Sequence, residues 1–224
     1  MHPLSYDHTT AVDLMRDQLD SILAAAESYS DYDLLGASRV HGWSRLDTVV
    51  HVRLGLEEMA GVCAAQVDGA PDHDAASYWV SFAEDDYDRV PHILWTRRTA
   101  AAYAEPHGAL RHLNQVADTL RIALRRMPDH PVLFQGKTMT SGDFIATWVV
   151  ELAVHQLDLG DGGGHPTPGS LSVVRETVEA LTDVRLPQEW DDEYAALVAL
   201  GRLPLPDDLQ DDRQDLASAL PVAL

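Results

Sequence analysis

Apolar side chains recur at helical spacing along most of the chain. In residues 9–29 the apolar positions are three, four and seven residues apart, which places them on one face of a helix. The same periodicity predicts further helices over residues 44–67, 85–104, 108–126, 142–158, 170–184 and 191–200. The pattern therefore predicts an all-α protein.

Local signals mark the boundaries of some elements. Ser44 precedes an apolar run and Asp47 follows three residues later, the spacing of a capping box at the start of a helix. β-forming residues on both sides of Gln135-Gly136 predict a short hairpin over residues 131–140. The polar stretch 71–84 predicts a long connection with room for a helical turn.

The predicted helix over residues 142–158 is apolar on nearly every side, which is typical of a helix inside a core. It nevertheless contains Glu151 and His155, which are four residues apart and so share one face. Asp158 lies three residues further along, near that face. A buried carboxylate is costly unless it meets a cation, a metal ion or hydrogen-bond donors. The pair therefore suggests two ligands of a metal ion.

His51 also interrupts an apolar run, in the helix predicted over residues 44–67. With Glu151 and His155 it completes a set of two histidines and one carboxylate. Three protein ligands leave a coordination position open, as in catalytic zinc sites, and the same set suits non-haem iron(II). Two other interpretations stay open: hydrogen-bonded core histidines, or a simple pair of Glu151 and His155 within one helix.

Composition narrows the classes of partner. Sixteen Lys and Arg residues against 36 Asp and Glu residues give a formal net charge of −20, which disfavours nucleic-acid and membrane binding. No apolar run approaches the ~20 residues of a membrane span. The first residues do not resemble a signal peptide, and the single cysteine, Cys63, fits a buried structural thiol. These features predict a cytoplasmic protein.

Three motifs occur in the same order as in a known family. Residues 42–52 contain Gly-Trp-Ser followed by His51, and residues 151–159 follow the pattern Glu-x-x-x-His-x-x-Asp-Leu. Residues 191–205 contain Asp-Asp followed by Gly-Arg-Leu-Pro-Leu. Over about residues 10–205 the chain thereby resembles the DinB-like, mycothiol-dependent maleylpyruvate isomerase superfamily.

The resemblance implies an up-down-down-up four-helix bundle with a divalent metal, usually zinc, at one end. It makes His51, Glu151 and His155 the metal ligands, with iron(II) or nickel(II) as alternatives to zinc. It also implies mycothiol as a thiol cosubstrate and an electrophilic small molecule as substrate. Arg202 matches a catalytic arginine of the isomerase, and Asp158 is expected to orient a metal-bound imidazole. The isomerase has a larger α/β domain after its bundle, whereas the residues after Pro166 predict helices here.

These expectations divide the chain into three parts: a metal-binding bundle over residues 1–160, a short helical segment over 166–206, and a mobile acidic tail over 207–224. The expected activity is thiol transfer or isomerisation. A metal-dependent hydrolase or lyase that uses no thiol is one alternative, and a non-catalytic metal- or ligand-binding protein is another. The sequence leaves the choice between monomer and dimer open.

Overall fold

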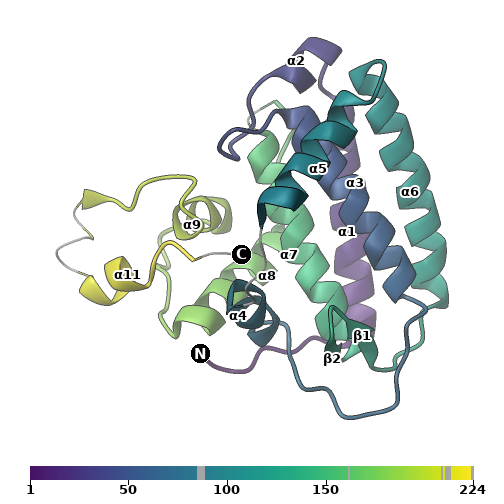
Figure 1. Ribbon diagram of the computed structural model, residues 1–224. Coiled ribbons are helices and arrows are strands. Elements are labelled where there is room, and N and C mark those ends of the chain that lie inside the picture. Colours follow the sequence, from purple (N-terminus) through teal and green to yellow (C-terminus); the bar gives the residue numbers. More distant parts are fainter. Residues whose placement is uncertain (85–88, 161, 208, 210–212, 223–224) are drawn as a thin grey trace.

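The computed structural model describes residues 1–84, 89–160, 162–207, 209 and 213–222. Its main body is a bundle of long helices, as Figure 1 shows. The bundle helices are α1 (His8–Glu27), α3 (Arg45–Val62), α6 (Pro106–Arg126) and α7 (Ser141–Leu159). The predicted all-α class is confirmed.

The order of the bundle helices is up-down-down-up. Helices α1 and α7 begin at the same end, where the Tyr6 N–H donates to Asp143 over 2.8 Å. Helices α3 and α6 begin at the opposite end, where the His107 N–H donates to Asp31 of the short helix α2 (Asp31–Leu35) over 2.9 Å. Figure 1 shows the same directions along the chain. The predicted bundle topology is therefore confirmed.

The α7 helix is buried along almost its whole length, as its composition predicts. It packs against α1 and α3 on the bundle side and against α8 (Pro168–Thr182) on the other side. Every residue of α7 is buried except Glu151 and His155, whose side chains are 30% and 13% exposed.

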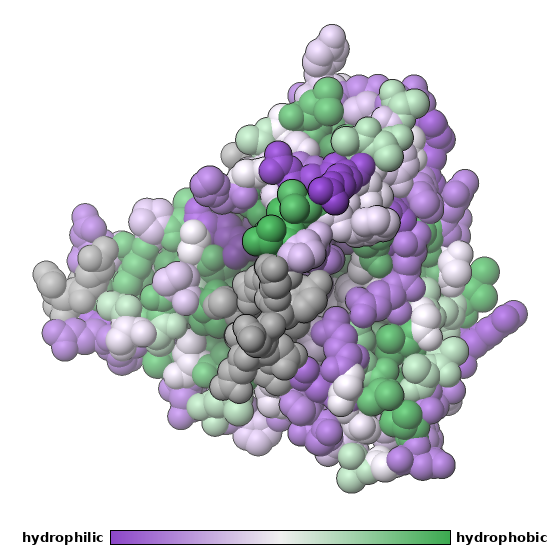
Figure 2. All heavy atoms as spheres, in the orientation of Figure 1, coloured by the Kyte–Doolittle hydropathy of each residue, from purple (hydrophilic) through white to green (hydrophobic). Residues whose placement is uncertain are grey.

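Two shorter elements connect α3 to α6. Residues 71–84, predicted as a connection with one helical turn, contain the eight-residue helix α4 (Ser77–Glu84). The helix predicted over 85–104 is α5 (Arg89–Ala101), and residues 85–88 of that prediction lie outside the described residues. Helix α5 packs on α3 while Leu94 and Trp95 stay exposed. Apolar and polar residues are accordingly interspersed on the face in Figure 2.

The predicted hairpin is confirmed, with β1 (Val132–Phe134) antiparallel to β2 (Lys137–Met139). Gln135 and Gly136 form its turn with φ angles of 48° and 78°. A positive φ at both central residues matches the right-handed twist of the two strands, and glycine adopts it without steric cost. The hairpin lies at the end of the bundle where α7 begins (Figure 1).

The C-terminal segment is helical, with α8 against α7 and α9 (Asp192–Ala199) against α8. A mobile tail over residues 207–224 stays a prediction, but the described part of this segment contains ordered structure. It contains α11 (Gln214–Ala219), in which Leu216 is fully buried, and the Val222 N–H donates to the Ala199 carbonyl over 2.8 Å. Leu209, Leu220 and Val222 are partly buried against the core, although the acidic residues around them suggest a solvated segment. No helix among the described residues is long and apolar enough to span a membrane.

Candidate metal centre

His51 reaches the interior from the second turn of α3. The start of this helix is fixed by Ser44, whose hydroxyl accepts from the Asp47 N–H while the Asp47 carboxylate accepts from the Ser44 N–H. This is the predicted capping box. The His51 side chain is 21% exposed and its ring meets the Trp43 ring edge-on at 5.3 Å between centroids. The defined helix start therefore sets where the imidazole points.

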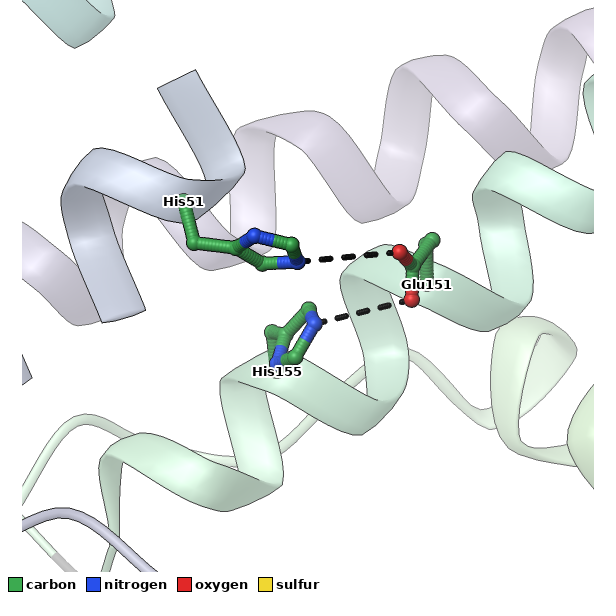
Figure 3. Close-up of side chains that lie close together, drawn as sticks. All are labelled: His51, Glu151 and His155. Carbon is green, nitrogen blue, oxygen red and sulfur yellow. Dashed lines mark ion pairs between the residues drawn. The ribbon is translucent and has the colours of Figure 1, made fainter. Parts of the chain in front are cut away.

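Glu151 and His155 project from one face of α7 toward His51, as Figure 3 shows. The Nε2 atom of His51 lies 3.8 Å from Oε1 of Glu151. The Nε2 atom of His155 lies 3.5 Å from Oε2 of the same carboxylate. The rings of the two histidines are 4.7 Å apart between centroids. His51 thus forms one cluster with two side chains that lie at least a hundred residues later in the sequence.

The geometry of this cluster fits a small divalent cation. One ligand atom from each of His51, Glu151 and His155 lies within 4.8 Å of the other two. Bonds of about 2.0–2.1 Å in a tetrahedral zinc site place neighbouring ligand atoms about 3.4 Å apart. The separations of 3.5 and 3.8 Å approach that value. Two imidazoles and one carboxylate also suit zinc or iron(II) in donor type.

The histidines favour the charged form of the carboxylate, and the carboxylates favour the charged form of His155. Burial raises the pKa of the Glu151 carboxyl, but the neighbouring His155 and His51 outweigh burial and hold that pKa below its usual value. Burial likewise lowers the pKa of His155, but Glu151 and Asp158 outweigh it and raise that pKa above its usual value. In the metal-free protein both carboxylates therefore favour the protonated form of His155.

Asp158 connects the cluster to the C-terminal segment. Its carboxylate is fully buried, and Oδ2 lies 3.2 Å from Nδ1 of His155. Arg202 donates to both oxygens of the same carboxylate, from Nε over 3.0 Å and from the terminal nitrogen NH2 over 3.1 Å. Its third nitrogen donates to the Leu200 carbonyl over 2.8 Å. Burial opposes the charge on Asp158, but His155 and Arg202 hold its pKa below the usual value.

Arg202, which was expected to be catalytic, is hydrogen-bonded within the protein. All three guanidinium nitrogens already have protein partners, because each donates to Asp158 or Leu200. The structure therefore places Arg202 behind Asp158, where it orients a carboxylate that contacts His155. Direct contact of Arg202 with a substrate stays a prediction.

His92 is a neighbour of the cluster that no sequence motif indicates. This residue lies on α5, and its Nε2 atom is 3.4 Å from Nδ1 of His51. Burial and the neighbouring His51 lower the pKa of His92. No spacing rule could have found it, because α5 and α3 are joined by a long connection and meet only in the folded protein.

A narrow pocket beside the cluster has an apolar wall. Its remaining lining residues are Val52, Gly55, Trp148 and Leu152, and it encloses about 10 Å³. A Cβ atom at Gly55 would lie 2.7 Å from Cζ3 of Trp148. Glycine at this position therefore lets the indole pack directly on α3. The close contact limits the space beside the three polar side chains.

The comparison with known proteins agrees with this architecture. Residues 15–160 match the family described as the mycothiol maleylpyruvate isomerase N-terminal domain. The chain belongs to this family. The match runs from α1 to the end of α7 and so includes every residue of the cluster. The C-terminal helices lie outside it.

Two solved structures resemble the fold. The crystal structure of the mycothiol-dependent maleylpyruvate isomerase aligns with a TM-score of 0.54 and 17% identity, covering 76% of this chain and 69% of that chain. A crystal structure of a histidine-to-alanine mutant of that isomerase aligns with a TM-score of 0.56 and 14% identity over the same shares. No curated protein matches the chain in sequence. At these identities the structural likeness concerns the fold alone.

Proposed function

We propose that the protein is a divalent-metal enzyme that uses a low-molecular-weight thiol, mycothiol, to modify or isomerise an electrophilic small molecule. The observation that carries the proposal is the convergence of His51, Glu151 and His155 in a chain of this family. We take the metal to be zinc, which the donor set suits, as it does iron(II). The solved relatives are named for mycothiol and maleylpyruvate, which supports a thiol cosubstrate and an electrophilic unsaturated acid here.

The chain's own residues would supply three ligands, and such a set leaves one coordination position for a further ligand. His51 and His155 present neutral nitrogen ligands, and the Glu151 carboxylate offsets one positive charge of a dication. A divalent cation held there would lower the pKa of a thiol bound beside it. A thiolate is the nucleophilic form that adds to activated alkenes, epoxides or ester carbons. Release of the thiol after bond rotation gives isomerisation, and its retention gives a conjugate.

The sulfur nucleophile must come from outside the chain. Cys63 is the one cysteine of the sequence, and it is buried at the C-terminal end of α3. Burial raises the pKa of its thiol to about 11, so the thiolate is scarce at neutral pH. A separate thiol cosubstrate is therefore required for the proposed chemistry.

The test is turnover by zinc-loaded protein supplied with mycothiol and a panel of electrophiles that includes maleylpyruvate, an epoxide and an activated ester. Products are followed by mass spectrometry and, for isomers, by chromatography. The proposal predicts product formation that requires both thiol and metal and is lost in His155→Ala. An exposed-histidine variant, His165→Ala, serves as the matched control because its side chain is 78% exposed.

Other outcomes would favour the other functions. Hydrolysis that needs metal but no thiol would contradict the proposal and favour a metal-dependent hydrolase. Metal binding without turnover of any electrophile would favour a binding protein.

A further inference from the structure

We propose that His92 is a positioning residue: it accepts a hydrogen bond from Nδ1–H of His51 and thereby leaves Nε2 of His51 free to bind the metal. The inference rests on the proposed function, because it assigns a role toward the same metal. It adds a residue from α5, which is outside the three-residue cluster.

The geometry shows that the two nitrogens of His51 face different partners. Nε2 faces Glu151 at 3.8 Å, on the side where the cluster converges. Nδ1 faces Nε2 of His92 at 3.4 Å, on the opposite side of the ring. The His51 and His92 rings are nearly perpendicular, at 86°, with centroids 5.5 Å apart. This arrangement places a nitrogen of His92 at the outer edge of the His51 ring.

Proton counting decides the direction of the hydrogen bond. A neutral imidazole carries one proton, on either Nδ1 or Nε2. A metal on Nε2 requires the proton to be on Nδ1, which makes Nδ1 a donor. The atom that faces this donor is Nε2 of His92, which must then be unprotonated, with the His92 proton on its own Nδ1. Each ring therefore holds one proton in a defined place.

The other histidine of the cluster has an equivalent partner. Nδ1 of His155 faces the Asp158 carboxylate at 3.2 Å, and Arg202 holds that carboxylate in place. Metal-bound histidines commonly donate their second N–H group to such an acceptor, which fixes both tautomer and ring orientation. His92 occupies the corresponding place for His51. The acceptor differs in kind, because a neutral ring replaces a carboxylate.

The packing of α5 against α3 makes this contact specific. His92 is partly buried, whereas Leu94 and Trp95 on the same helix are exposed. The His51 ring also meets Trp43 at 5.3 Å and His155 at 4.7 Å between centroids. Neighbouring rings thus confine His51, and among these three His92 has a ring nitrogen at hydrogen-bond distance from Nδ1. Loss of His92 should leave the fold intact, but the proton of His51 would then no longer be held on Nδ1.

The experiment measures zinc affinity by competition with a chelator in the wild type, His92→Ala and His92→Gln. The side-chain oxygen of glutamine can accept Nδ1–H but cannot exchange a proton as histidine does. We expect a loss of about 10-fold or more in His92→Ala and recovery in His92→Gln. His112→Ala is the matched control, because His112 is a partly exposed histidine that contacts Tyr103 and Glu57 instead. Thermal unfolding of each metal-free variant checks the fold.

A spectroscopic readout separates positioning from a merely structural role. Two-bond ¹H–¹⁵N spectra of histidine-labelled, zinc-loaded protein report which ring nitrogen is protonated. The expected result is a proton on Nδ1 of both His51 and His92, with the His51 signals broadened or shifted in His92→Ala.

The outcomes distinguish this inference from the proposed function. Equal zinc affinity in the wild type and His92→Ala, or a proton on Nε2 of His92 in the zinc-loaded protein, would overturn the role of His92 alone. A wild type that binds no zinc would overturn the proposed function and the inference together. Zinc binding with the expected effect of His92→Ala but no thiol-dependent turnover would leave the inference standing.

Discussion

Arg202 holds Asp158 through a two-pronged ion pair, with N–O distances of 3.0 and 3.1 Å. Asp158 is fully buried and contacts His155 on its other side. The C-terminal segment, which follows the part of the chain that matches the family, therefore reaches the cluster through one carboxylate. The orientation of His155 depends on residues that come more than forty positions later in the sequence.

Asp158→Asn should weaken both stability and metal binding. It leaves the partly exposed Arg202 guanidinium without its carboxylate, and because breaking a fully buried ion pair costs about 3–5 kcal/mol, we expect a smaller loss here. Loss of an acceptor for a metal-bound histidine should lower zinc affinity about 10–100-fold. Urea unfolding of the metal-free protein and chelator competition measure the two effects. Asp192→Asn is the matched control, since it breaks the Arg175–Asp192 ion pair between α8 and α9 without touching His155. Equal effects of the two variants on zinc affinity would contradict this account.

The contribution of His155 to the stability of the metal-free protein should fall as pH rises. The pKa of His155 is raised in the folded state, because Glu151 and Asp158 outweigh the effect of burial. Protonation of His155 therefore stabilises the fold fully below about pH 6.5, the ordinary value for histidine, and this contribution disappears as pH rises through the raised pKa. Zinc affinity should change in the opposite direction, because protons compete with the metal.

Urea unfolding of the metal-free wild type and His155→Gln over a range of pH values tests this dependence. The difference in unfolding free energy between them should shrink with increasing pH. A difference that stays constant would show that His155 is not protonated in the metal-free fold.

Two glycines of α3 should respond oppositely to alanine. Gly55→Ala places a Cβ atom 2.7 Å from the Trp148 ring, and such overpacking costs about 1–3 kcal/mol. Gly61→Ala meets no atom within 4 Å and should gain about 0.5–1 kcal/mol from helix propensity. Chemical unfolding gives both values. Because Trp148 lines the pocket, Gly55→Ala should also reduce zinc affinity, while Gly61→Ala should not. Stabilisation by both variants would mean that the indole does not pack on Gly55.

Local patterns predicted much of the fold because they depend on nearby residues. The Ser44–Asp47 capping box, the hairpin turn at Gln135-Gly136 and the burial of α7 each follow from spacing or composition within one element. The convergence of Glu151 and His155 needs only their positions on one helix. His51 could be included because it is a polar residue in a second apolar helix, and a buried polar residue needs a partner.

The spacing of apolar and polar residues does not predict contacts between elements that are distant in sequence. His92 meets His51 because α5 folds back on α3, and Arg202 meets Asp158 because α8 packs against α7 and α9 packs against α8. Neither pairing leaves a periodic signal in either segment. The buried Leu216 in α11 was missed for a related reason, because the surrounding acidic residues dominate the composition of that segment.

Metal content tests the central claim most directly. Wild type, His155→Ala and the control His165→Ala are purified without a metal-binding tag, incubated with zinc, desalted and analysed by inductively coupled plasma mass spectrometry. The account predicts about one zinc ion per chain in the wild type and in His165→Ala, and almost none in His155→Ala, which lacks one of three protein ligands. No bound zinc in the wild type, or equal zinc in the wild type and His155→Ala, would contradict it.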